Sequence, residues 1–203
     1  MVGWLVPARL IENPSAVLEL QLSQKLSIPS QSGIGNKSDE AIWLFDGRPH
    51  TLHEVNDPRY VDTPRAHVLN TDGVLETIPS LHLQYRITDV TAPDEDGLMW
   101  AINYQWSGDR RLRARRDEIQ ERWGFGRTHA QQVGRRVERL VALRQTAHGI
   151  VADERAPILL RLDGPDRNWE GIARHRDGFL LITDTYPETI FAYVPAPDTH
   201  RDN

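Results

Sequence analysis

One hairpin pattern recurs three times along this chain, and it constrains the fold more than any other feature. Each copy has an Asp-Gly pair between two runs of β-prone residues, which is a strong short-range signal for a β-hairpin. Each copy opens with a carboxylate and closes with an acid or amide 14 positions later. The opening and closing residues are Glu40 and Glu54, Asp89 and Asn103, and Glu170 and Asp184.

The spacing also predicts how these residues lie. In a hairpin whose turn is near the midpoint, residues equally far from the turn face each other, with Cβ atoms about 4.5–5.5 Å apart. We therefore expect each opening residue to meet its closing residue at the open end of its hairpin. A base stands three positions before each opening acid: Lys37, Arg86 and Arg167.

The distance between copies points to a particular β architecture. The opening acids are 49 and then 81 residues apart, and the longer interval holds a polar, Arg-rich segment of helix formers at about 108–134. Without that segment the period returns to about 49, close to the 40–50 residues of a four-stranded propeller blade. The sequence predicts one all-β domain over residues 1–203. It is a partial β-propeller of about three to four four-stranded blades, with a short helical insertion.

Further strands are expected between the hairpins, at 66–69, 74–78, 137–143 and 158–162. Only 189–194 follows the third hairpin, so the last unit is short of a strand, which residues 18–22 could supply. Three units and a partial one do not close a ring comfortably. We expect further blades upstream of Met1 or, alternatively, assembly with another copy of the chain.

Three stretches resemble one propeller family. Residues Arg167–Ala173 (RNWEGIA), with Gly178–Asp184 (GFLLITD), resemble the N-x-E-G-(I/L)-A and L-(L/V)-x-(S/T)-D blade of phytase-like propellers, the family labelled esterase-like activity of phytase. Asp39–Ile42 and Tyr85–Asp89 resemble its blade openings, so the resemblance covers about residues 36–195. It implies a calcium- or phosphate-related hydrolase and suggests an exported or periplasmic location.

The acidic residues are the candidates for chemistry. If the hairpins are innermost in successive blades, these residues ring one mouth of a central channel. Carboxylate and amide oxygens are the ligands that calcium takes. By analogy with a calcium-dependent lactonase-type propeller, the cation would polarise a carbonyl while a carboxylate acts as general base. The candidate metal ligands are Glu40, Glu54, Asp89 and Asn103, the candidate bases Glu170 and Asp184, and the candidate ligand-binding residues Arg86, Arg167 and Trp169.

The repeated bases support a second interpretation. Lys37, Arg86 and Arg167 could each pair with a blade-opening acid and lock the hairpin to its neighbour. The chain would then be a non-catalytic binding or scaffold propeller. The alternative is a metal-dependent hydrolase of a phosphoester or lactone at the channel mouth.

Composition narrows the partners. The formal net charge of −5 does not suggest a nucleic-acid-binding surface, and no apolar run approaches the length of a membrane span. The absence of cysteine excludes disulfides, zinc-thiolate sites and a cysteine nucleophile. Residues 1–17 do not have the pattern of a signal peptide, so the location stays open. We expect a small-molecule ligand, no nucleic acid or membrane partner, and self-association if the ring is incomplete.

Overall fold

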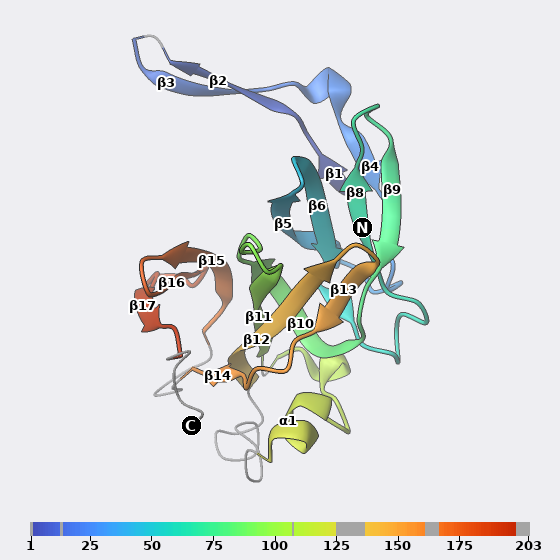
Figure 1. Cartoon of the computed structure of the whole chain (residues 1–203), viewed down its shortest axis with the longest axis vertical. Helices are drawn as coiled ribbons and strands as arrows, with labels where there is room; N and C mark the ends of the chain where they lie inside the picture. The colour runs from blue at the N-terminus through green and yellow to red at the C-terminus, as the bar shows by residue number, and fades with distance from the viewer. Residues whose placement is uncertain (1, 13, 107, 125–136, 161–166, 198–203) are drawn as a thin grey trace.

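The computed structural model describes residues 2–12, 14–106, 108–124, 137–160 and 167–197, and most of them form antiparallel β-strands (Figure 1). The predicted all-β class is therefore confirmed. Near the N-terminus two short strand pairs flank a 3-10 turn at Leu22–Gln24. They are β1 (Gly3–Leu5) with β4 (Leu26–Ile28), and β2 (Ala8–Glu12) with β3 (Ala16–Leu20).

Three larger sheets follow in chain order, named here the first, second and third sheet. The first sheet is a four-stranded antiparallel meander. Its last two strands coincide with those predicted at 66–69 and 74–78. Its strands are β5 (Asp39–Phe45), β6 (Arg48–His53), β8 (Arg65–Leu69) and β9 (Leu75–Pro79).

The second sheet is the largest, and the third has three strands. The second consists of β7 (Val55–Asn56), β10 (Leu83–Val90), β11 (Leu98–Gln105), β12 (Val137–Thr146) and β13 (Gly149–Ala152), with β14 (Ile158–Leu159) paired to β12. The third consists of β15 (Trp169–His175), β16 (Gly178–Thr183) and β17 (Phe191–Pro195).

The predicted helical insertion is confirmed in its described part. A 3-10 turn at Arg110–Leu112 precedes α1 (Glu118–Trp123), and the remainder of the expected insertion lies outside the described residues. The side chain of Asp117 caps α1 by accepting a hydrogen bond from the backbone N–H of Gln120 at 3.2 Å. Gly124 ends the helix in the left-handed conformation, with φ of +58°.

The three repeated hairpins form, but with a register that differs from the prediction. Each first strand carries a β-bulge at the opening acid, between Asp39 and Ala41, between Ile87 and Val90, and between Trp169 and Gly171. A bulge sets two residues opposite one, so it displaces the acid from its expected partner. The closing residues instead lie opposite Ser38, Ile87 and Asn168, each two positions before the opening acid. The expected direct acid-to-acid pairing was therefore wrong.

The Asp-Gly pairs have different roles in the first and third hairpins. Asp46 and Gly47 form the two-residue turn of the first, both with positive φ, as a type I′ turn requires. The third hairpin turns one residue earlier, before Gly178. Gly178 instead lets β17 approach, because a Cβ there would lie 2.4 Å from the carbonyl oxygen of Val194.

The second sheet is buried on both faces, and β11 shows how its sequence achieves this. All eight residues of β11 are buried, and successive side chains point to opposite faces of the sheet. Met99 and Ala101 pack into a core shared with the first sheet, which includes Trp43 and Leu52. Leu98, Trp100, Ile102 and Tyr104 pack into a core shared with the third sheet, which includes Trp169, Phe179 and Leu181.

The residues predicted to be apolar strands therefore build two cores, one on each side of the middle sheet. In the part of the chain described here, no helix is long and apolar enough to cross a membrane.

Candidate functional site

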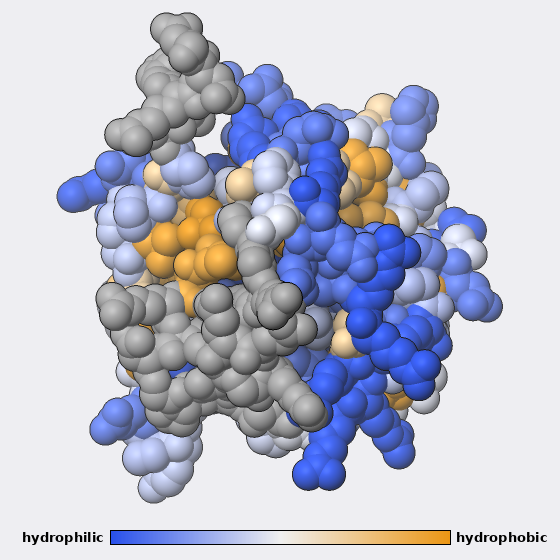
Figure 2. All heavy atoms as spheres, turned by 90° about the horizontal axis from the view of Figure 1, so that it is seen from below, coloured by the Kyte–Doolittle hydropathy of each residue, from blue (hydrophilic) through white to orange (hydrophobic). Residues whose placement is uncertain are grey.

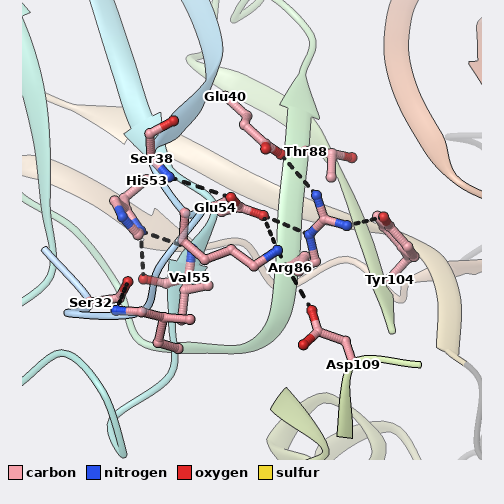
Figure 3. Close-up of polar contacts among 12 residues, drawn as sticks. Ser32, Ser38, Glu40, His53, Glu54, Val55, Arg86, Thr88, Tyr104 and Asp109 are labelled. Atoms are coloured by element: carbon pink, nitrogen blue, oxygen red, sulfur yellow. Dashed lines mark hydrogen bonds and ion pairs between the residues drawn. The ribbon is translucent and has the colours of Figure 1, made fainter. Parts of the chain in front are cut away.

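The first strands of the three repeated hairpins lie together, with β10 next to both β5 and β15. At this junction Arg86 of β10 contacts three carboxyl groups: those of Glu40 in β5 and of Glu54 after β6, both drawn in Figure 3, and that of Glu170 in β15. Its Nε donates to Oε2 of Glu54 at 2.6 Å, and its Nη2 donates to Oε2 of Glu40 at 3.3 Å. The same Nη2 lies 3.8 Å from Oε1 of Glu170. Arg86 is thus the centre of a polar cluster.

The backbone before Arg86 is unusual. Tyr85 has a φ of +68°, in the left-handed region that non-glycine residues rarely adopt. The pairing of β10 with β7 also shifts register between Leu83 and Arg86. Such backbone costs on the order of 1–3 kcal/mol and is found preferentially at functional sites. The local conformation therefore supports a role for this cluster beyond packing.

Glu54 is the buried member of the cluster, with no exposed side-chain surface. Besides the bond from Arg86, it accepts from Nζ of Lys37 at 3.1 Å and from the backbone N–H of Ser38 at 3.4 Å. Nζ of Lys37 also lies 3.6 Å from Oδ2 of Asp109. Glu54 is therefore held by two cations, and Lys37 pairs with the closing acid of its hairpin rather than the opening one.

Tyr104 and Asn168 complete the cluster. The guanidinium of Arg86 donates to the Tyr104 hydroxyl and lies 4.9 Å from the centre of its ring. That hydroxyl donates to Oδ1 of Asn168 and lies 3.4 Å from Oε1 of Glu170. Burial raises the pKa of Tyr104 above its usual value, so the hydroxyl keeps its proton. The tyrosine thus connects Arg86 to the third sheet.

Two carboxyl groups of the cluster remain partly exposed, at 28% for Glu40 and 27% for Glu170. Burial, reinforced by the negative charge of Glu54, raises the pKa of Glu40 to about 8. Burial also raises the pKa of Glu170, and the charge of Asp184 adds to the effect. Glu40 is therefore mostly protonated near neutral pH, and the two groups can exchange protons with a ligand at this surface.

This shift has a consequence for stability that can be measured. Between pH 4.5, the ordinary value, and about 8, folded Glu40 keeps a proton that the unfolded chain releases. Folding therefore becomes less favourable as pH rises through this interval. We expect Glu40→Gln to flatten the fall in the free energy of unfolding between about pH 5 and about pH 9. Urea unfolding across that range tests it, with exposed Glu95→Gln as the control. An unchanged slope in Glu40→Gln would contradict the shift.

Asp89 and Asn103, two of the candidate metal ligands, lie in other interactions. Asp89 accepts from the backbone N–H groups of Ile172 at 2.8 Å and Val90 at 2.9 Å, which ties β10 to β15. Oδ1 of Asn103 accepts from Nε of Arg139 at 2.8 Å. The side-chain amide of Asn103 donates to two carbonyls of β10. Of the four predicted ligands, only Glu40 and Glu54 belong to the cluster around Arg86.

The remaining predicted site residues divide in the same way. Glu170 belongs to the cluster, and exposed Asp184 follows β16 and donates its backbone N–H to the carbonyl of Asn168 at 2.7 Å. Trp169 is 4% exposed and donates from Nε1 to Oε2 of Glu138 at 2.7 Å, within the second core. Arg167 donates its backbone N–H to the other carboxylate oxygen of Glu138 at 3.2 Å.

Among the described residues, no group of three or more His, Cys, Asp or Glu side chains is arranged to hold a metal ion. Calcium therefore stays a prediction from the sequence. The sequence analysis did not identify Tyr104 or Asn168. Tyr104 is adjacent to Asn103, which the sequence analysis did identify, and Asn168 is the asparagine of the N-x-E-G stretch quoted for the family resemblance.

A second buried polar group lies in the first sheet. Oδ2 of Asp39 accepts from the hydroxyl of Thr51 at 2.6 Å and bonds Nδ1 of His67 at 2.8 Å. His53 is fully buried, and burial lowers its pKa. These contacts satisfy one carboxylate oxygen of Asp39, whereas its buried Oδ1 has no hydrogen-bond partner among the described residues.

Comparisons with known proteins identified no relative of this chain. No protein-family model, curated protein or solved structure matches the chain.

Proposed function

We propose that the three larger sheets are successive blades of a partial, phytase-like β-propeller. Two observations support the proposal. Each sheet contains one of the three repeated hairpins, with the same bulge at an acidic residue. The first strand of the second hairpin, β10, lies next to both β5 and β15, as innermost strands around a propeller axis would.

We infer that the cluster around Arg86 is a hydrolytic site at the mouth of this axis. One observation carries the inference. Glu40 and Glu170, from different sheets, approach the same guanidinium nitrogen, and both are partly exposed with raised pKa values. Titratable groups with perturbed pKa values at a partly exposed site are typical of functional centres.

The charge of the cluster favours one class of substrate. With Glu40 protonated, three carboxylates, those of Glu54, Glu170 and Asp109, face the two bases Lys37 and Arg86, which leaves one excess negative charge. With Arg86 already engaged by carboxylates, a phosphoester would meet net negative charge. A neutral lactone or ester would not be repelled in this way. We therefore propose a carbonyl ester or lactone as substrate.

The two exposed acids have complementary roles in this proposal. Glu170 removes a proton from the attacking water, and the nearby charge of Arg86 favours its ionised form. Glu40, which is protonated near neutral pH, donates a proton to the leaving alkoxide. Arg86 and Tyr104 position both groups through the contacts described above. Calcium stays a prediction from the sequence, and the comparison of rates with calcium and with EDTA tests it.

The test is hydrolysis of 4-nitrophenyl acetate and dihydrocoumarin by the wild-type chain, Glu40→Gln and Glu170→Gln, with calcium and with EDTA. We expect each variant to lower kcat/KM by about 10²-fold or more. Glu95→Gln is the matched control, because Glu95 is exposed and far from the cluster in the β10–β11 connection.

No wild-type rate above buffer on either probe, or full activity in both variants, would contradict the hydrolytic site. Equal rates of hydrolysis with calcium and with EDTA would show that the reaction does not need calcium.

One observation favours the non-catalytic alternative, a scaffold propeller. Glu54 is fully buried and satisfied by Lys37, Ser38 and Arg86, as a structural ion pair would be. The same assay distinguishes the two, because a scaffold predicts no hydrolysis while the variants remain folded.

A further inference from the structure

The hairpin of β2 and β3, named here the arm, projects from the rest of the chain (Figure 1). All ten of its strand residues are exposed. Cross-strand pairing places Ala8 opposite Leu20 and Leu10 opposite Leu18, so one face of the arm is apolar. Leu10, Leu18 and Leu20 are each more than half exposed. A lone two-stranded hairpin is marginally stable in water, so this face requires a partner.

The third sheet offers an unpaired edge. In the part of the chain described here, β17 pairs only with β16, whereas the other two larger sheets have at least four strands. Ala192 and Val194 of β17 pack on the second core, while Phe191 and Tyr193 alternate with them and are 67% and 47% exposed. An edge strand with exposed apolar residues is a site for strand addition.

Figure 2 shows hydrophobic residues reaching the surface in separate areas of one face. Exposed apolar surface of this kind marks interaction sites on soluble proteins.

We propose that the arm of one copy pairs with the free edge of β17 in a second copy. The arm of the second copy pairs in the same way with β17 of the first. Three observations favour a second copy as the occupant. Each chain carries one arm and one edge, so two chains satisfy both features. Strands β3 and β17 are each five residues long. The added strand would also continue the antiparallel ladder β15–β16–β17 beyond its third strand.

The side-chain pattern agrees with this pairing. Leu18 and Leu20 alternate along β3 as Phe191 and Tyr193 alternate along β17, so each pair can occupy one face of the extended sheet. The opposite face of the arm carries the Ile11–Val17 pair beside Arg9–Glu19, and it would continue the face of β17 that holds Ala192 and Val194. Reciprocal exchange of an identical element is a common route to a two-fold dimer.

The first experiment measures the mass of the wild-type chain by size exclusion with light scattering over a range of concentrations. We expect a dimer that Leu18→Lys with Leu20→Lys, or Phe191→Lys with Tyr193→Lys, converts to a monomer with an unchanged circular dichroism spectrum. Val74→Lys is the matched control, because Val74 is 55% exposed at the β8–β9 turn and should leave the dimer intact. A wild-type monomer at every concentration would overturn the proposal.

The second experiment uses the absence of cysteine in the chain. A mixture of Leu18→Cys and Tyr193→Cys copies should form a cross-linked dimer on oxidation, and a mixture of Val74→Cys and Tyr193→Cys should not. The double variant Leu18→Cys with Tyr193→Cys should also cross-link between chains. A disulfide within one chain would mean that the arm folds back on its own sheet, and no cross-link would mean that the dimer uses another surface. Either result overturns the exchange.

Discussion

Replacing Arg86 with methionine is expected to lower the free energy of unfolding by about 3–5 kcal/mol, the cost of breaking a buried ion pair by removing one partner. Methionine keeps much of the side-chain volume and removes the charge. Glu54, with no exposed side-chain surface, would lose its 2.6 Å partner and keep only Lys37 as a cation. Tyr104 would lose the cation beside its ring. Urea unfolding followed by circular dichroism measures the change.

The control for this prediction is Arg48→Met. Arg48 lies 4.0 Å from Asp46 at the first hairpin turn, where both side chains are exposed, so its loss should have little effect. Adding Glu54→Gln to Arg86→Met should restore part of the stability, because it removes a buried charge that has lost the closer of its two cations. If Arg86→Met unfolds at the wild-type urea concentration, Glu54 does not depend on this pair.

A second large loss, also about 3–5 kcal/mol, is expected from Arg139→Met. Arg139 on β12 donates to both carboxylate oxygens of Asp117, at 2.9 and 3.0 Å, and both side chains are less than 10% exposed. Arg139 also bonds Asn103. Because Asp117 caps α1, an unpaired Asp117 should loosen the helix as well. Amide hydrogen exchange should therefore quicken in α1 together with the fall in urea stability.

Arg122→Met provides the matched comparison. Arg122 also pairs with an acid, Glu154 at 2.8 Å, but its side chain is 42% exposed and that of Glu154 is 92% exposed. We expect this variant to unfold close to the wild type. Equal losses from Arg122→Met and Arg139→Met would show that burial does not govern these pairs.

The sequence was sufficient to predict the hairpins and most of the strands that follow them. Two apolar runs around a turn signal depend only on local chemistry, and those signals are strong around Asp46-Gly47. It was not sufficient for the register. A bulge adds one unpaired residue, and nothing in the spacing from Glu40 to Glu54 reveals on which strand that residue lies. The bulge accounts for one of the two positions by which the partners are displaced. The other arises at the turn, where Phe45 pairs with Arg48, one position off the register that a Glu40–Glu54 pair requires.

The sequence predicted which residues belong to the site better than it predicted which of them contact one another. Glu40, Glu54, Glu170 and Arg86 follow from the repeat, and the structure brings them together. Their partners depend on how the sheets pack, which sets Lys37 on Glu54 and Arg86 between three carboxyl groups. The contact of Arg139 with Asp117 joins positions 22 residues apart, so no short-range pattern could reveal it.

The double burial of the second sheet has a consequence for how the molecule comes apart. Its residues serve two cores at once, through alternate side chains of the same strand. Damage to β11 is therefore felt by both neighbours, and neither outer sheet can keep its core if the middle one opens. The three sheets should therefore unfold together rather than as independent units. Loss of structure should spread from the second sheet to the first and third sheets.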